Sequence, residues 1–184
     1  MTLDVSMTEK GPSEIHGTSN YVYPVYDEEG KNRLFYLWAF DSMSDNCEGV
    51  AGWGCVYPDS VEWFREKSKQ LIEADGGKVL PGYGFFHIPL PEYLDMTNAM
   101  LHYGEKREDV CCSSVNTGLY SAFKEMDNIK AVFCGHDHNN DFWGHYYGID
   151  LYFGRKTGHG GYGPKIGMKR GARILEFSVQ NETV

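Results

Sequence analysis

The stretch Cys134-Gly135-His136-Asp137-His138-Asn139-Asn140-Asp141 decides the fold of this chain. It follows an apolar run, Ile129 to Cys134, which is typical of a buried strand. Two imidazoles two residues apart project the same way from an extended backbone, so they can bind one metal ion or a close pair of ions. Asp137, Asn139 and Asp141 could orient the imidazoles, although a simple acidic turn would have the same sequence. The stretch predicts a metal-binding loop at the end of a strand.

A second apolar run, Gly82 to Phe86, ends at His87 and is followed by Ile88-Pro89-Leu90-Pro91-Glu92. A single histidine at a strand end is more often a packed, hydrogen-bonded residue than a ligand. Two strands that each end in histidine can, however, bring their ends together in one sheet. We therefore predict that His87, His136 and His138 are metal ligands.

The remaining histidines give weaker signals. His159 lies in a glycine-rich loop near Arg155, and such a loop can bind an anion through backbone N–H groups and a guanidinium, so both are candidate substrate-binding residues. His145 stays open, whereas His16 and His102 are expected to be structural or solvated. Asp41 is the one early acidic residue at a strand end, and it is a weak candidate ligand.

Length and composition indicate one soluble globular domain. The chain has 184 residues, of which 41% are hydrophobic and 15% aromatic. Its net charge of −9 argues against non-specific binding to nucleic acid or to an anionic membrane. A late cluster of basic residues could still receive an anionic substrate; it comprises Arg155, Lys156, Lys165, Lys169, Arg170 and Arg173.

The five cysteines are odd in number and lack a Cys-x-x-Cys spacing, so reduced thiols are the simpler interpretation. The alternative is a bridge between Cys47 and Cys55 in an oxidising compartment. Residues 1–10 have no apolar core of a signal peptide, and the longest apolar run, Leu34 to Phe40, is too short to span a bilayer. A cytoplasmic location follows by default, provided that the chain begins at its true amino terminus.

Strands and helices are expected to alternate after a polar amino-terminal arm, residues 1–20, which predicts a layered α/β fold. No second domain is expected. The expected strands are 21–26, 33–40, 78–87, 129–134, 142–147, 149–153 and 172–179. The expected helices are 61–74, 92–103 and one running from a cap at Ser114 or Asn116 to Met126, with loops at 41–57, 104–114 and 158–164.

Three segments carry a resemblance to a known family. They are Gly84-Phe85-Phe86-His87-Ile88-Pro89-Leu90-Pro91-Glu92-Tyr93, Val132-Phe133-Cys134-Gly135-His136-Asp137-His138-Asn139-Asn140-Asp141-Phe142 and the glycine-rich segment from Tyr152 to Gly163. Together they resemble the carboxy-terminal half of a calcineurin-like metallophosphoesterase, and most closely the purple-acid-phosphatase-related group. The likeness covers roughly residues 15 to 178.

The resemblance implies part of a four-layer α/β/β/α sandwich with mixed sheets, spanning residues 21–184. It also implies a site for divalent or trivalent ions (iron, zinc or manganese), with His87 and His136 on one metal and His138 on the other. The family's first aspartate, its Gly-Asp-x-x-Asp motif and its Gly-Asn-His motif lie upstream of the matched region, and residues 1–20 do not supply them. The site would therefore hold one ion more readily than two.

These expectations leave three interpretations open. The first is a phosphatase that acts on phosphate monoesters, with activity that is weakened or lost because the upstream ligands are missing. The second is a catalytically silent binding or regulatory module that keeps the fold. The third is a partial sequence, through gene truncation or an incomplete gene model. A missing part of the sheet would also leave an exposed edge through which another chain could associate.

Overall fold

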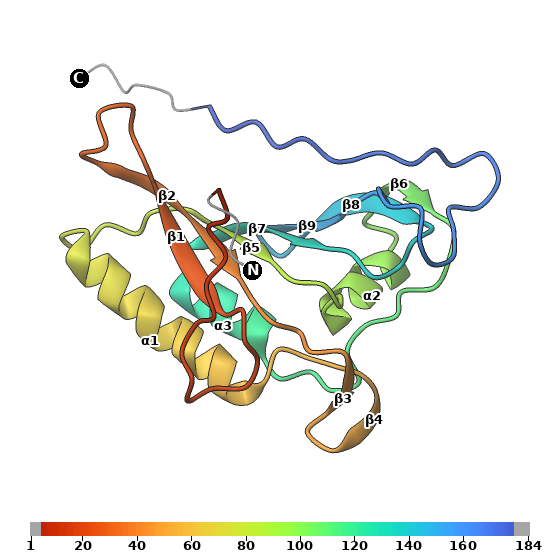
Figure 1. The fold of residues 1–184 in the computed structure, drawn as a ribbon, viewed down its shortest axis with the longest axis horizontal. Helices are drawn as coiled ribbons and strands as arrows, with labels where there is room; N and C mark the ends of the chain where they lie inside the picture. The colour runs from red at the N-terminus through yellow and green to blue at the C-terminus, as the bar shows by residue number, and fades with distance from the viewer. Residues whose placement is uncertain (1–4, 179–184) are drawn as a thin grey trace.

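The computed structural model describes residues 5–178, and the described part forms nine strands and three helices (Figure 1). The strands are β1 (Tyr21–Tyr26), β2 (Arg33–Ala39), β3 (Asp45–Cys47), β4 (Val50–Trp53), β5 (Gly82–Phe85), β6 (Tyr103–Lys106), β7 (Ile129–Cys134), β8 (Asn140–Tyr146) and β9 (Ile149–Phe153). The helices are α1 (Pro58–Ala74), α2 (Pro91–Asn98) and α3 (Leu119–Met126).

Seven strands form one mixed sheet in the order β1-β2-β5-β7-β9-β8-β6. Its centre is parallel, because β5 pairs in parallel with both β2 and β7, and β7 pairs in parallel with β9. Both ends of the sheet are antiparallel. At one end β1 pairs with β2, and at the other β8 pairs with β9 and with β6. The predicted α/β class is confirmed, whereas the four-layer sandwich remains a prediction.

The three helices cover one face of this sheet (Figure 1). Trp38 on β2 packs against Phe64 of α1 at a ring-centroid distance of 4.8 Å, and Phe64 packs against Phe123 of α3 at 5.1 Å. From α2, the Tyr93 hydroxyl donates to the carbonyls of Val132 and Tyr152, so it links β7 to β9. This fully buried layer packs against the central strands, whose ends form the candidate site.

The opposite face carries a row of aromatic rings and the carboxy-terminal segment, which runs along it in Figure 1. Phe177 stacks on Phe35 at 4.6 Å, and the Arg173 guanidinium lies 5.1 Å from the centre of the Tyr152 ring. The predicted strand 172–179 is wrong over its described residues, 172–178, because this segment makes no strand ladder. Its alternation arises because side chains at every second position, including Arg173 and Leu175, face the sheet.

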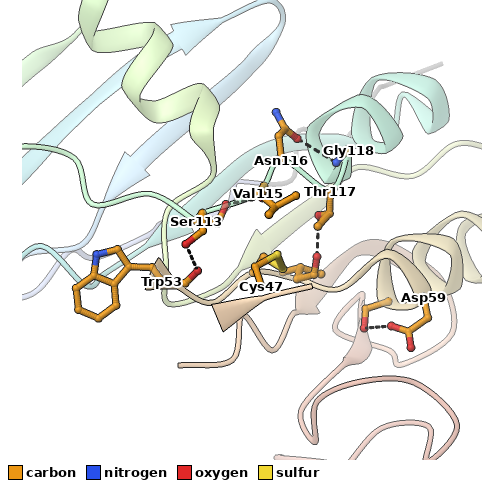
Figure 2. Close-up of a disulfide and its surroundings, with 12 residues drawn as sticks. Cys47, Trp53, Asp59, Ser113, Val115, Asn116, Thr117 and Gly118 are labelled. Atoms are coloured by element: carbon orange, nitrogen blue, oxygen red, sulfur yellow. Dashed lines mark hydrogen bonds between the residues drawn. A yellow bond between two sulfur atoms is a disulfide. The ribbon is translucent and has the colours of Figure 1, made fainter. Parts of the chain in front are cut away.

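The expected loop 41–57 is also wrong in part, since it contains the β3–β4 hairpin, which is closed by a disulfide between Cys47 and Cys55 (Figure 2). The reduced state predicted for these two thiols is corrected accordingly. Glycines in left-handed conformations allow the tight turn, with a φ of 76° at Gly49. Thr117 donates to the Val56 carbonyl, which anchors the hairpin to the segment before α3.

Opening this disulfide is expected to lower the free energy of unfolding by about 2–3 kcal/mol, because the bridge restricts the unfolded chain. The measurement is urea unfolding of the Cys47→Ser/Cys55→Ser double variant against the native chain. A thiol titration of the denatured native protein should give three free thiols, those of Cys111, Cys112 and Cys134. Five reactive thiols, or equal stability of the two proteins, would contradict the bridge.

Several element boundaries differ from the sequence expectation. The expected strand 78–87 is observed only as β5, Gly82–Phe85, and the expected strand 142–147 as β8, Asn140–Tyr146. The expected helix 92–103 ends at Asn98. The expected loop 104–114 begins with β6, which pairs with β8, and Gly104 allows the close approach of the two backbones with a positive φ. Helix α3 starts after Gly118, where Asn116 accepts a hydrogen bond from the Gly118 N–H instead of capping the helix directly. Within residues 5–178, none of the helices has the length and apolar character needed to cross a membrane.

Candidate metal and phosphate site

The candidate site lies where three parallel strands end. His87 follows β5 by two residues, His136 follows β7 by two residues, and Arg155 follows β9 by two residues. Because parallel neighbours end at the same edge of a sheet, these side chains meet there. Two backbone hydrogen bonds fix the arrangement: the Gly135 N–H donates to the His87 carbonyl at 3.0 Å, and the Gly154 N–H donates to the Cys134 carbonyl at 2.8 Å.

A pocket of about 280 Å³ opens at this edge. All three histidines predicted as ligands line it, together with basic and small residues from the end of β9. The lining residues are His87, Gly135, His136, Asp137, His138, Gly154, Arg155, Lys156, Thr157 and Gly158. The structure therefore brings the sequence-predicted histidines to one cavity.

His87 and His136 form a close pair, with ring centroids 5.2 Å apart and planes at 85°. Desolvation and the neighbouring His138 ring lower the pKa of His87. Desolvation, followed by His87 and His138, lowers the pKa of His136. Both imidazoles are therefore neutral near pH 7, which is the form that binds metal ions.

His138 is held by the glycine-rich loop. Its Nδ1 lies 2.7 Å from the Tyr162 carbonyl, its ring stacks on the Tyr162 ring at 4.2 Å, and its backbone N–H donates to the Tyr162 hydroxyl. A carbonyl can only accept, so Nδ1 carries the proton in this contact. The lone pair is then on Nε2, which makes Nε2 the nitrogen available for a ligand.

The polar residues of the motif hold neighbouring loops rather than the imidazole rings. Asp137 Oδ2 accepts from the Cys111 N–H and from the Asn140 amide. Asn139 binds both Glu108 and the Lys165 N–H. Buried Asp137 Oδ1 has no hydrogen-bond partner among the described residues, so it is a free acceptor beside the pocket.

The two predicted substrate-binding residues are placed differently. Arg155 lines the pocket, but its guanidinium binds Asp141 at 2.5 Å and lies 3.6 Å from Glu105. His159 belongs to the adjacent loop and is not among the lining residues. Asp41 accepts hydrogen bonds from the Thr18 and Met43 N–H groups, so its carboxylate stabilises the local backbone.

Other histidines lie outside the pocket. His16 contacts Asp59 and stacks on Tyr57. His145 pairs with Asp150 across the β8–β9 hairpin at 2.7 Å. The first contact joins residues 43 positions apart and the second residues five positions apart, and both involve exposed rings.

Two further residues touch the predicted ligands, and sequence reasoning missed the first of them. Trp53, on the disulfide-closed hairpin, packs edge-on against His136 at 4.2 Å, and Lys156 Nζ lies 3.1 Å from His138 Nδ1. Trp53 lies 83 positions before His136, so no spacing pattern reveals the contact. Lys156 carried a signal, because it follows the candidate Arg155 in the glycine-rich segment.

The donor set fits a metal ion only in part. Imidazole is a suitable ligand for zinc and iron, and two neutral rings lie edge to face with their centroids 5.2 Å apart. However, across residues 5–178 no group of three or more His, Cys, Asp and Glu side chains is arranged to hold a metal ion. His138 contacts the Tyr162 carbonyl through Nδ1, so only Nε2 of this ring could take part in a ligand set.

Three curated relatives show what the chain is similar to. The "Probable inactive purple acid phosphatase 29" of Arabidopsis thaliana is 31% identical over 174 residues, which cover 88% of this chain and 44% of that protein. The "Probable inactive purple acid phosphatase 28" of the same plant is 32% identical, with 88% and 42% covered. "Phosphatase DCR2" of Saccharomyces cerevisiae is 28% identical, with 76% and 26% covered.

No protein-family model matches the chain, and no solved structure does. The chain spans less than half the length of these curated relatives. The similarity nevertheless extends over most of the chain and includes relatives from a plant and a yeast. Over most of its length the chain is therefore similar to curated purple acid phosphatase-like proteins and to a phosphatase, which agrees with the resemblance carried by its histidine motifs.

Proposed function

We propose that the pocket binds a divalent or trivalent cation through His87, His136 and His138 and that the chain contributes to the hydrolysis of phosphate monoesters. The observation that carries this proposal is the gathering of three imidazoles and two basic side chains around one pocket at the ends of β5, β7 and β9. Imidazoles suit a metal ion, and basic side chains suit the phosphate group that such an ion would activate.

The residues of the pocket would have separate roles. His87 and His136 would supply two ligands, and His138 would add Nε2 as a third. A bound ion would polarise the phosphoryl group and lower the pKa of a bound water. The Trp53 ring packs against the His136 ring at 4.2 Å, and the Tyr162 carbonyl fixes the tautomer of His138.

A second candidate is a catalytically silent module that binds a metal or a phosphate group without turnover. Two observations favour it: the described side chains do not form a three-ligand group, and the curated relatives from Arabidopsis thaliana carry "inactive" in their names. This module would keep the fold and the pocket but would lack efficient hydrolysis.

A phosphatase assay with added iron, zinc or manganese, paired with metal analysis, separates the two candidates. Hydrolysis of an aryl phosphate that depends on metal and is abolished in His136→Ala supports the enzyme. Bound metal without turnover supports the module. Turnover that is unchanged by a chelator and by His136→Ala would refute the proposed site, because neither the metal nor the ligand would then matter.

Metal affinity is expected to fall as the pH is lowered below the pKa values of His87 and His136. Protonation removes the lone pair, and both values lie below the ordinary 6.5, so affinity should change little between pH 8 and pH 7. Below the lowered pKa values, the metal affinity should fall roughly tenfold per pH unit for each proton that the metal displaces. Zinc titrations from pH 8 to pH 5 test this, and equal affinity at both ends would count against histidine ligation.

A further inference from the structure

The basic side chains near the pocket differ in the groups that they bind. Arg155 and Arg173 share the carboxylate of Asp141, at 2.5 and 2.6 Å. Arg170 donates to the carbonyls of Gly158 and Gly163, and Lys165 donates to the carbonyl of Arg107. These side chains hold the loops together, so most of the basic cluster that the sequence displays is not available to a ligand.

Lys156 differs from Arg155 and Arg173 because it has no carboxylate partner among the described residues, and from Arg170 and Lys165 because it lines the pocket. Its Nζ donates to the Gly160 carbonyl at 2.6 Å and lies 3.1 Å from His138 Nδ1, and it makes no salt bridge within the described part of the chain. It lines the same pocket as the three histidines. Its positive charge is therefore not neutralised by a carboxylate, in a chain whose net charge is −9.

The contact between the Lys156 ammonium group and His138 does not stabilise the fold by itself. His138 Nδ1 carries the proton that it donates to the Tyr162 carbonyl, so it cannot also accept a hydrogen bond from the ammonium group. A cation beside a neutral N–H group gains nothing from that contact. The ammonium group donates to the Gly160 carbonyl but has no negatively charged partner within residues 5–178, and an anion that entered the pocket would supply one.

We propose that Lys156 is the residue that binds the phosphate group in this pocket, whereas Arg155 is a positioning residue that ties the end of β9 to Asp141. This inference rests on the proposed function and names its anion-binding group. At about 280 Å³ the pocket lies at the small end of the range for ligand sites, which suits a phosphate group rather than a large ligand.

The test is calorimetric binding of inorganic phosphate to the full chain, with and without zinc. Lys156→Gln is expected to weaken phosphate binding about tenfold, whereas Lys156→Arg keeps most of it. The matched control is Lys130→Gln, on β7 and outside the pocket, where Lys130 lies 3.9 Å from Asp127; its phosphate affinity should equal that of the native chain. Arg155→Gln should lower thermal stability more than it lowers phosphate affinity.

A second measurement does not depend on how the variants fold. In the native chain, phosphate should shift the Lys156 Nζ resonance in an NMR titration. Absence of that shift, or unchanged affinity in folded Lys156→Gln, overturns the inference. If phosphate binding depends on Lys156 but the chain shows no turnover, the role of Lys156 is upheld and the proposed hydrolysis is refuted. The two proposals can therefore fail separately.

Discussion

Replacing Phe123 with alanine is expected to lower the free energy of unfolding by about 3–5 kcal/mol, the largest stability effect of any change considered for this chain. Phe123 on α3 is fully buried and packs against Phe40 and Phe64, which connect the sheet to α1. Its removal leaves a cavity between the three elements. Because each kcal/mol shifts the melting temperature by roughly 2–4 °C in a chain of this size, Tm should fall by about 6–20 °C.

Differential scanning calorimetry of Phe123→Ala checks this, and Ile166→Ala is the control. Ile166 is an apolar residue whose side chain is fully exposed in the loop after Pro164, so its removal should change stability by no more than about 0.5 kcal/mol. Equal losses in the two variants would mean that α3 does not form the core contact between helices and sheet.

The second large effect concerns the metal. His136→Ala is expected to weaken zinc binding by at least about 100-fold, because loss of a ligand should exceed the 10–100-fold loss seen for residues that only orient ligands. The backbone φ of His136 is 74°, a conformation that alanine also disfavours, so this variant alone does not separate loss of the ligand from local strain.

His87→Ala separates the two causes, since His87 is not among the positive-φ residues and it pairs with the same ring. It should weaken zinc binding to a similar degree. His145→Ala is the control, because His145 is exposed and contacts Asp150 far from the pocket lining. Competition with a chromophoric chelator measures all three. If both His87→Ala and His136→Ala kept full zinc affinity, the zinc would not be bound in this pocket.

The sequence predicted the elements whose pattern is local. The hairpin of β1 and β2, helix α1 and the strand β7 were all predicted close to their observed bounds, because alternation, a proline start and an apolar run depend on neighbouring residues. The meeting of His87 and His136 was inferred correctly from two strands that end in histidine. That inference needed only the parallel pairing of β5 with β7.

What could not be predicted depends on contacts between distant segments. The β3–β4 hairpin is stabilised by a disulfide and by hydrogen bonds from Ser114 and Thr117, which lie about 60 positions away. The segment 172–178 has the alternation of a strand, but it lies across a sheet face and lacks a neighbouring strand among the described residues. Arg155 seemed a better anion ligand than Lys156 because the pairing of Arg155 with Asp141 is a tertiary contact.

The central claim is that three imidazoles from two strand ends share one cation. X-ray absorption at the zinc edge of the zinc-loaded chain tests it most directly. The account predicts nitrogen neighbours at about 2.0–2.1 Å with the outer-shell signal of imidazole, and one imidazole fewer in each of His87→Ala, His136→Ala and His138→Ala. A zinc spectrum without imidazole features, or one that none of the three substitutions alters, would contradict it.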